Sequence, residues 1–481
     1  MLPDVNTGID LTEQSKSVED AAEGVGSATL HYDGKEPLNL SSRIDPFQLL
    51  KSFRNLLKGT LARNASWMLL GQGFKLLIQA LYFTLIARSL GPQNYGAFVG
   101  VVGLVGILLP FATMGSGYLL IKNVARDECR FRKDWGSALL TTLLSASVLF
   151  GVVILISRFV LPASIPIRLV IMVAAADLFG TSIAVICGHS FIAFERMKWA
   201  ACLNVFLSAL RLVAAIILAT AHASPTALQW GGLYLGSTSI VMLLALLLVS
   251  VKLGTPTFGF SRSAAEIREG LYFSVMQSAQ TIYNDIDKAM LSRLSTLEAT
   301  GIYGAAYRIV DVSFAPVAAV LVAAFPGFFR VGADGISATL RYVKPLILRA
   351  LGYAALVAVG LLIGARLLPL ILGDEYRLTV EALRWLAVLP LLKAVHSFLA
   401  DALTGAGYQA LRTVISAGVA VFNVLINIWI IPLYSWRGAA WSSIASDALL
   451  IFGIGTAVFI LSRRSQSFPG RTKALDARAE A

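Results

Sequence analysis

A succession of apolar segments, each 20 or more residues long, fills this chain from about residue 64 to residue 461. A helix needs about 20 predominantly apolar residues to cross the ~30 Å hydrocarbon core of a bilayer. The chain is 57% hydrophobic and 14% charged, with a mean hydropathy of +0.73, which is far from the composition of a soluble domain. Because backbone polar groups in lipid must bond within their own segment, the sequence predicts an all-α polytopic membrane protein.

We expect about twelve transmembrane helices, six in each half of the chain, around a central polar cavity. The N-terminal six-helix lobe would cover residues 64–260 and the C-terminal lobe residues 261–465. The expected spans lie near 64–87, 94–121, 137–160, 167–193, 201–221, 229–251, 269–293, 300–328, 345–372, 380–404, 411–433 and 438–461.

The two ends of the chain differ in composition from these spans. Residues 1–45 scatter acidic side chains among Ser, Gly, Thr and Ala, which is typical of a disordered tail. In residues 46–63, basic side chains share one helical face and leucines cover the other, which predicts an amphipathic helix on an anionic leaflet. Residues 466–481 are expected to form a second tail.

Basic residues indicate the orientation in the membrane. The N-terminal flank and the 122–133 loop are rich in Lys and Arg, and the opposite side carries fewer than half as many basic residues. By the positive-inside rule, both termini are cytoplasmic. Since the loops account for the formal charge of +12, we expect no nucleic-acid partner. The three cysteines have no metal-ligand or disulfide spacing, so we predict no metal and no cofactor.

The segment 269–293 is of membrane length but carries polar side chains along one helical face. These side chains recur at steps of three and four: Ser274, Gln277, Ser278, Thr281, Asn284, Asp285 and Lys288. An Asp or Lys near the middle of a bilayer costs roughly 2.5–3.5 kcal/mol on insertion scales. We therefore expect this face to line a water-filled cavity. The alternative is a polar seam that holds helices together.

The expected seventh span resembles the first, which indicates an internal repeat. At one constant offset, Gln72, Lys75, Gln79 and Arg88 match Gln277, Gln280, Asn284 and Arg293, and Tyr95-Gly96-Ala97 then matches Tyr303-Gly304-Ala305 after a short slip. Six spans per half make both halves enter from the same side, so the halves would be parallel repeats related by an axis along the membrane normal. A chance match of small and polar residues is the alternative.

Ionisable groups also interrupt other spans. If roughly ten of them faced lipid, they would cost on the order of 25–35 kcal/mol. They must therefore converge inward. Lys75, Arg211 and Lys393 have no partner on their own helix, which makes them candidates for binding an anion. The candidate substrate-binding residues of the cavity are Gln72, Lys75, Gln79, Arg211, Gln277, Asn284, Lys288, Arg308 and Lys393.

Some of these charges could instead neutralise one another. Arg308 and Asp311 are i,i+3 neighbours, and so are Asp285 and Lys288. The acidic residues offer a second role, since coupling of transport to H⁺ or Na⁺ would use Asp285, Asp287 or Asp447.

Two segments carry a family resemblance. ARSLGPQNYGAF leads into the Gly- and Pro-rich GLVGILLPFATMGSG, and GIYGAAYRIVDVSFAPVAAVLVAAFPGFFR opens the second half. Over about residues 64–461 the chain resembles the polysaccharide-repeat-unit flippases of the multidrug/oligosaccharidyl-lipid/polysaccharide exporter superfamily. The resemblance implies two six-helix lobes and transfer of undecaprenyl-pyrophosphate-linked oligosaccharide from the cytoplasmic to the periplasmic leaflet of the bacterial inner membrane.

Further expectations follow from this resemblance. The lobes would alternate access to the cavity, with Pro110, Pro316, Pro326 and Pro390 as helix breaks or fixed kinks. The partners would be the lipid-linked glycan, the bilayer, and polysaccharide polymerase or export proteins, and we expect a monomer.

Three alternatives stay open. A lipid II flippase has nearly the same requirements, whereas a cation-coupled drug exporter of the same superfamily would favour a more acidic cavity. A membrane glycan polymerase or ligase would need a sizeable external loop, and the outer loops are short. With no nucleophile motif and no paired carboxylates in a soluble loop, we predict that the chain is not an enzyme.

Overall fold

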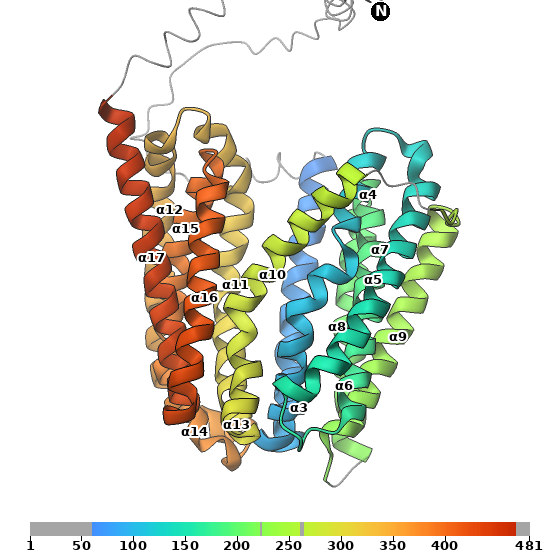
Figure 1. Cartoon of the computed structure of the whole chain (residues 1–481), viewed down its shortest axis with the longest axis vertical. Coiled ribbons are helices and arrows are strands. Elements are labelled where there is room, and N and C mark those ends of the chain that lie inside the picture. Colours follow the sequence, from blue (N-terminus) through green and yellow to red (C-terminus); the bar gives the residue numbers. More distant parts are fainter. Residues whose placement is uncertain (1–59, 222–223, 260–263, 468–481) are drawn as a thin grey trace, which may run out of the picture. The chain divides into compact units, whose positions relative to one another are not determined.

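The computed structural model describes residues 60–221, 224–259 and 264–467, which form helices and contain no strand (Figure 1). The predicted N-terminal tail, most of the predicted amphipathic helix, and the predicted C-terminal tail beyond residue 467 lie outside the described residues. The long helices are α3 (Thr60–Thr113), α5 (Phe131–Val160), α8 (Met197–Ala221), α9 (Ala227–Lys252), α10 (Ala264–Leu294), α11 (Leu297–Gly332), α12 (Ile336–Gly364), α16 (Gln409–Tyr434) and α17 (Trp436–Ser467). The shorter ones are α4 (Ser116–Val124), α6 (Ile167–Ala174), α7 (Ser182–Ala193), α13 (Leu368–Leu372), α14 (Arg377–Leu386) and α15 (Leu389–Gly405).

Nine helical segments of the described ranges are long and apolar enough to cross a membrane, or ten if the bent pair Asp374–Leu386 and Leu389–Gly405 is one span. Two features account for the difference between ten spans and the twelve expected. Leu70–Val124 counts once although a break divides it, and α10 does not count because polar residues interrupt its apolar surface. The all-α membrane fold is confirmed, and the twelve-helix layout in two lobes stays a prediction.

The break in α3 lies at Gly91, between the expected first and second spans. Gly91 has φ 68° and ψ 168°, and Pro92 follows it. A positive φ is readily adopted only by glycine, and proline cannot continue the hydrogen-bond ladder of a preceding helix. The sequence GPQNYG therefore ends the first segment of α3 and starts the second without an intervening loop.

The expected fourth span is interrupted by a π-helical segment, Ala175–Thr181, between α6 and α7. Such segments are uncommon and occur frequently at functional sites. Asp177 lies in this segment and is 6% exposed. The locally widened helix thus carries a buried carboxylate, which connects it to the polar clusters described below.

Each half of the chain has its own apolar core. One cluster lies wholly on N-terminal helices, around Phe131, Trp135 and Phe191. Another lies wholly on C-terminal helices, around Phe328 and Phe398. Each half therefore contains an apolar cluster formed by its own helices.

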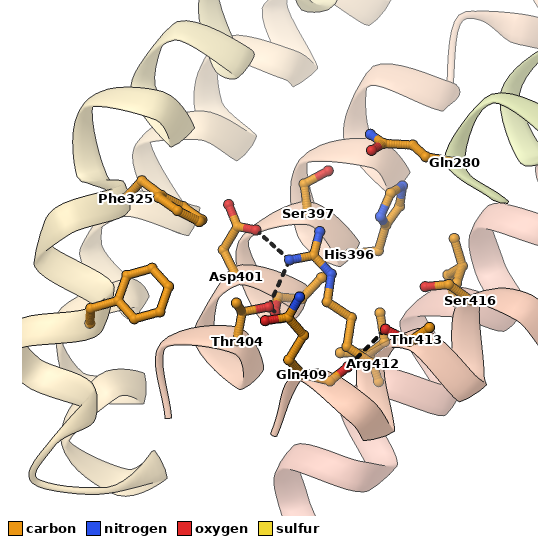
Figure 2. A pocket seen from close by; sticks show the side chains of 14 residues that line it. Gln280, Phe325, His396, Ser397, Asp401, Thr404, Gln409, Arg412, Thr413 and Ser416 are labelled. Atoms are coloured by element: carbon orange, nitrogen blue, oxygen red, sulfur yellow. Dashed lines mark hydrogen bonds and ion pairs between the residues drawn. The ribbon is translucent and has the colours of Figure 1, made fainter. Parts of the chain in front are cut away.

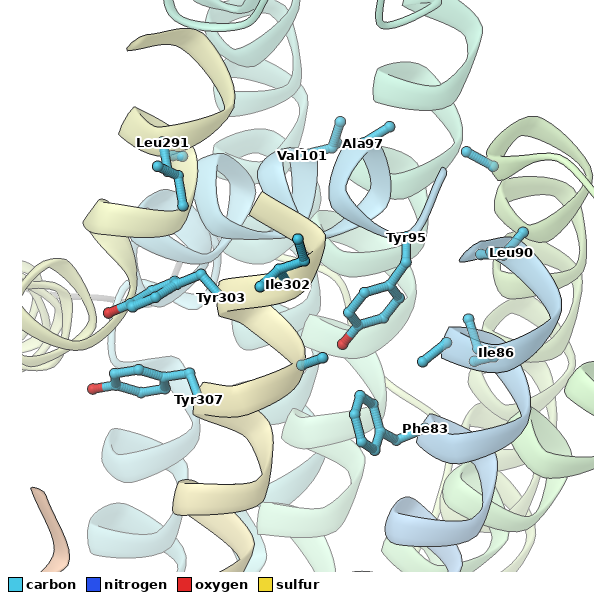
Figure 3. Close-up of a cluster of buried hydrophobic side chains, with 14 of the residues drawn as sticks. Phe83, Ile86, Leu90, Tyr95, Ala97, Val101, Leu291, Ile302, Tyr303 and Tyr307 are labelled. Carbon is cyan, nitrogen blue, oxygen red and sulfur yellow. The ribbon is translucent and has the colours of Figure 1, made fainter. Parts of the chain in front are cut away.

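A third apolar cluster joins the halves through α3 and α11 (Figure 3). A Cβ atom on Gly96 would meet the carbonyl oxygen of Leu297, and one on Gly301 would meet the carbonyl oxygen of Pro92. Glycine at these positions lets the two backbones approach closely, as small residues do in membrane helix pairs. Tyr303, in the second copy of the Tyr-Gly-Ala motif, is fully buried in this cluster.

α10 contacts both halves, as its diagonal course in Figure 1 indicates. Near its start, Glu269 accepts from Lys122 on α4 at 2.8 Å. Ser274 and Ser278 are buried and donate to the carbonyl oxygens of Pro110 and Ile107 on α3, at 3.0 and 2.7 Å. Both serines thus form a seam between helices, which was the alternative to a cavity lining, and Ser274 also lines one of the cavities described below.

The prolines expected as helix breaks have different positions in the described helices. Pro110 lies inside α3, and Pro316 lies inside α11, which runs on past it to Gly332. Pro390 is in the first turn of α15, directly after the bend between α14 and α15. Proline fits there because the N–H groups of a first helical turn have no helical partner to lose.

Candidate functional site

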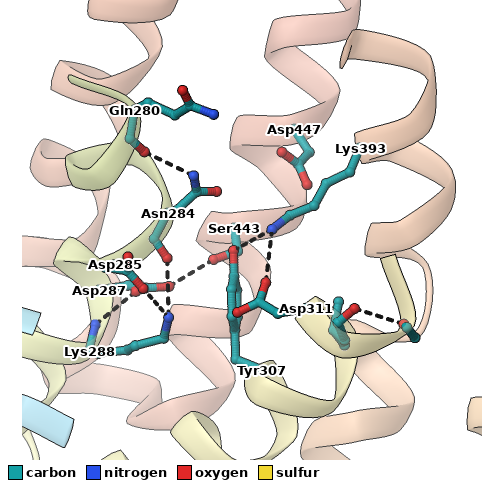
Figure 4. A network of polar contacts seen from close by, with 12 residues as sticks. Gln280, Asn284, Asp285, Asp287, Lys288, Tyr307, Asp311, Lys393, Ser443 and Asp447 are labelled. Carbon is teal, nitrogen blue, oxygen red and sulfur yellow. Dashed lines mark hydrogen bonds and ion pairs between the residues drawn. The ribbon is translucent and has the colours of Figure 1, made fainter. Parts of the chain in front are cut away.

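A network of charged groups occupies the interior of the C-terminal half (Figure 4). Lys288 forms an ion pair with Asp285, as the i,i+3 spacing indicated. The neighbouring Asp287 accepts hydrogen bonds from the hydroxyls of Tyr303 and Ser443, the latter at 3.1 Å. The carboxylates of α10 are thus held by partners on α10, α11 and α17, which stabilises them in an apolar environment.

Tyr307 connects this network to a second lysine, Lys393 of α15. The Lys393 ammonium donates to the Tyr307 hydroxyl at 2.9 Å and lies 3.6 Å from Asp311. The ammonium groups of Lys288 and Lys393 are 4.0 and 4.7 Å from the centroid of the Tyr307 ring. An aromatic face attracts cations, so this one ring helps to hold two buried positive charges.

Asp447 and a set of amides lie beside these lysines. Asp447 is 1% exposed and its carboxylate is 3.3 Å from His396. On α16, Asn427 donates to Asn423 at 3.0 Å, and Asn423 donates to Ser446 at 2.9 Å. The polar residues of α15, α16 and α17 therefore converge inside the C-terminal half.

The N-terminal half has a smaller cluster around Arg211. Its guanidinium lies 3.7 Å from Asp177, in the π-helical segment, and 4.2 Å from the centroid of the Tyr234 ring. The Tyr234 hydroxyl donates to the same carboxylate at 2.8 Å. Thr181 and Thr238 lie 3.5 and 3.4 Å from the guanidinium. Arg211 is thus held by a carboxylate, an aromatic face and two hydroxyls.

A third group of polar residues lies on α3 and α11, which join the halves. Arg308 donates to Gln79 at 3.2 Å. Lys75, one turn before Gln79, has Arg308 and Arg211 as its charged neighbours, and both carry its own sign. Among the residues that the structure describes, Lys75 has no ion pair and no side-chain hydrogen bond. Lys75 of α3, Arg211 of α8 and Arg308 of α11 are thus electrostatic neighbours of like charge, and of the three only Arg211 forms an ion pair among the described residues.

Two of the cavities that adjoin α10 lie one in each half. The first, of about 440 Å³, is lined by Gln277, Thr281 and Asp285 of α10 together with residues of α3, α4 and α7. The second, of about 450 Å³, is lined by Gln280 of α10 and by residues of α11, α15, α16 and α17 (Figure 2). The polar helix predicted from the sequence thus contributes side chains to both hollow spaces.

The predicted site residues are distributed over these features. Lys288 and Lys393 belong to the C-terminal network, Arg211 to the N-terminal cluster, and Lys75, Gln79 and Arg308 to the junction. Gln277 lines the 440 Å³ cavity, whereas Asn284 donates to the backbone of Gln280 at 2.9 Å, and Gln72 is exposed near the start of α3.

One charge pair suggested by spacing is absent, and two cations without a partner on their own helix pair with carboxylates of other helices. Arg308 and Asp311 form no ion pair, because Asp311 faces Lys393 and Arg308 faces Gln79. Arg211 and Lys393 do have carboxylate partners, Asp177 and Asp311, on other helices. Spacing along one helix reveals only local partners, so it could not find pairs formed by packing between helices.

Sequence reasoning also missed the aromatic residues of these clusters, Tyr234, Tyr303 and Tyr307. Each contributes a hydroxyl hydrogen bond, and the rings of Tyr234 and Tyr307 face cations. A tyrosine inside an apolar span does not by itself indicate a polar site, because its ring is compatible with a membrane helix. Its hydroxyl needs a partner when buried, and that need was the available signal.

Comparisons with known proteins agree with this architecture. A family model described as polysaccharide biosynthesis protein matches residues 61–331. An inward-facing multidrug-resistance MATE transporter of the MOP superfamily has a TM-score of 0.65 at 16% identity, over 81% of this chain and 96% of that chain. Its outward-facing counterpart has a TM-score of 0.59 at 15% identity, over 85% and 98%.

The lipid II flippase MurJ, in an inward closed conformation, has a TM-score of 0.68 at 10% identity, over 81% of this chain and 87% of that chain. No curated protein matches the sequence. At these identities the solved structures establish a common fold.

Proposed function

This chain belongs to the polysaccharide biosynthesis protein family, and we propose that it is a flippase for undecaprenyl-pyrophosphate-linked oligosaccharide repeat units. It would move them from the cytoplasmic to the periplasmic leaflet of the inner membrane for assembly of surface polysaccharide. Its fold is that of membrane transporters and flippases. Assignment of this cargo rests on the chemistry of the polar groups.

The observation that carries the proposal is the cation group Lys75, Arg211 and Arg308. Like charges in an environment of low dielectric repel one another strongly, and Lys75 has no carboxylate partner among the described residues. A pyrophosphate group would remove this repulsion, since its oxygens accept charge-assisted hydrogen bonds from Lys and Arg. A cationic drug would increase the repulsion, so the drug-exporter alternative is disfavoured.

The physical task of a flippase fits this arrangement. The polyprenyl tail of the cargo stays in the bilayer, and only the charged and hydroxylated head needs a polar path. We propose that the two halves rock about the α3–α11 contact and alternately open the path to each side. α10, which contacts both halves, would bend or shift during this change.

We further propose that Gln72, Gln79, Gln277 and Asn284 contribute hydrogen bonds to the head group, and that Lys288 and Lys393 extend the positive field. Asp285, Asp287 and Asp447 are the proposed sites of coupling to H⁺ or Na⁺. Transport that is insensitive to both gradients would remove that role. The proposal also includes cytoplasmic N- and C-termini. The protein would act as a monomer and would contact polysaccharide polymerase or export proteins.

Replacement of Lys75 tests the cargo assignment. In a strain that lacks the chromosomal gene, we expect K75A to lower surface polysaccharide at least about tenfold, the cost of one charge-assisted contact. K75R should retain most export because it keeps the charge. K198A is the matched control, since Lys198 lies over the ring of Trp67 at 5.2 Å, away from the cation group.

The lipid-linked species that accumulates in the K75A strain identifies the cargo. A polyprenyl pyrophosphate bearing the polysaccharide repeat unit supports the proposal. Accumulated lipid II would select the cell-wall alternative. Export at the wild-type level in K75A, with the protein present in the membrane, would exclude Lys75 from cargo binding.

A further inference from the structure

The 450 Å³ cavity of the C-terminal half combines an aromatic wall with a polar floor (Figure 2). Its volume lies in the range of about 300–1,000 Å³ that is usual for small-molecule sites. Five helices, α10, α11, α15, α16 and α17, contribute to its lining. The charged residues already assigned to the cation group do not line it, so its chemistry needs a separate account.

The aromatic wall consists of Phe325 and Phe329, which lie on successive turns of α11. Their ring centroids are 5.1 Å apart, with the planes at 79°. Phe325 and Phe329 line the cavity and are 41% and 48% exposed. An aromatic face carries partial negative charge and attracts C–H groups that carry partial positive charge. The wall thus offers a surface for the C–H face of a ring-shaped polar molecule.

The floor is built around an ion pair between Arg412 and Asp401. Arg412 donates to the Asp401 carboxylate and to the Thr404 hydroxyl, each at 2.8 Å. The guanidinium has further N–H groups, and the carboxylate has further lone pairs. Side chains of Ser397, Gln409, Thr413 and Ser416 add hydroxyl and amide groups around this pair.

The floor therefore presents donors and acceptors side by side, while the charges of Asp401 and Arg412 cancel. Because these two charges offset each other, the floor has no net attraction for a phosphate or for a simple cation. A lipid chain would leave the hydrogen-bonding groups unsatisfied. A neutral molecule with many hydroxyls and an apolar ring face fits all of these surfaces.

We propose that this cavity binds a sugar ring of the cargo, and this inference rests on the proposed function. One face of a pyranose would pack against Phe325 and Phe329, and its hydroxyls would bond to Asp401, Arg412 and their neighbours. Phe325 lies about 25 Å beyond Arg308 along the axis of α11. The site would therefore hold a sugar distant from the pyrophosphate, and it would contribute to selection of a complete repeat unit.

The test measures two kinds of binding to the purified full-length chain. Saturation-transfer NMR reports binding of maltose, lactose and N,N′-diacetylchitobiose, which contain neither lipid nor phosphate. Thermal unfolding reports binding of undecaprenyl pyrophosphate, which contains no sugar. We expect at least one disaccharide to bind to the wild-type protein.

The double variant F325L/F329L should weaken disaccharide binding at least about fivefold and leave the affinity for undecaprenyl pyrophosphate unchanged. F452L is the matched control, since Phe452 on α17 is 72% exposed and does not line the cavity. K75A should give the reverse result, with weaker binding of undecaprenyl pyrophosphate and unchanged binding of sugar.

The outcomes separate the two proposals. Absence of binding by all three disaccharides, or binding that F325L/F329L does not change, overturns the sugar site. Sugar binding that depends on the two phenylalanines, together with no binding of undecaprenyl pyrophosphate, supports the sugar site and contradicts the proposed cargo.

Discussion

Several buried charges in this protein are neutralised by partners that packing brings from other helices. The Asp177–Arg211 pair is one case, since both side chains are largely buried and the Tyr234 hydroxyl also donates to the carboxylate. Removal of one member of such a pair leaves the other as an uncompensated buried charge. This is more destabilising than loss of the pair as a whole.

D177N should therefore destabilise the detergent-solubilised protein, by about 3–5 kcal/mol on the scale of buried pairs. The double variant D177N/R211Q should recover part of the lost stability, because no buried charge is left unpaired. Thermal unfolding of the wild type, both single variants and the double variant measures the coupling. Additive effects of the two substitutions would show that the pair does not act as a unit.

The sequence predicted that the charged residues of the spans face the protein interior, but it did not predict which residues they contact. The cost of a charge in lipid places Lys75, Arg211 and Lys393 inside the protein, and this follows from the residue type alone. Their partners depend on the relative rotation and height of neighbouring helices. For this reason the i,i+3 pair Asp285–Lys288 was predictable, whereas Lys393–Asp311 was not.

At the scale of helices, the close contact between α3 and α11 is the feature that joins the halves. Gly96 and Gly301 face backbone carbonyl oxygens of the opposite helix, and Gly304 faces Val99. The two Tyr-Gly-Ala motifs that suggested a repeat thus lie at one shared contact. The repeat itself stays a prediction, but the motifs have a packing role that explains their small residues.

G301A should separate α3 from α11, because a Cβ atom there would collide with the carbonyl oxygen of Pro92. Overpacking of this kind typically costs about 1–3 kcal/mol and shifts the backbone. We expect a lower midpoint of thermal unfolding and reduced export. G352A is the matched control, since a Cβ atom on Gly352 of α12 would meet nothing within 4 Å. Wild-type stability of G301A would mean that the helices can move apart without cost.

The helices themselves were largely predictable, and their irregularities were not. Apolar length identified the spans, and the break at Gly91 lies between the first two expected spans. The π-helical segment around Asp177 and the bend before Pro390 depend on packing against neighbours. A period of 3.6 residues in the sequence does not reveal where a helix locally widens.

At the scale of the molecule, the N-terminal and C-terminal helices are in contact through α3, α10 and α11, and cations lie near this contact. Composition and apolar segments were sufficient to predict the membrane fold. The sequence predicted a polar cavity but not the two separate cavities, because their positions depend on how neighbouring helices pack. We propose that the positive charge at this contact binds the anionic head of a glycolipid as it crosses the bilayer.

Reconstitution into vesicles tests that claim most directly. Undecaprenyl-pyrophosphate-linked oligosaccharide, extracted from the strain that lacks the gene, is placed in the inner leaflet, and its oxidation by external periodate is followed over time. We predict that wild-type protein exposes the sugar to periodate and that K75A vesicles resemble protein-free vesicles. Exposure by wild-type protein no faster than in protein-free vesicles, or equal exposure by K75A, would contradict the account.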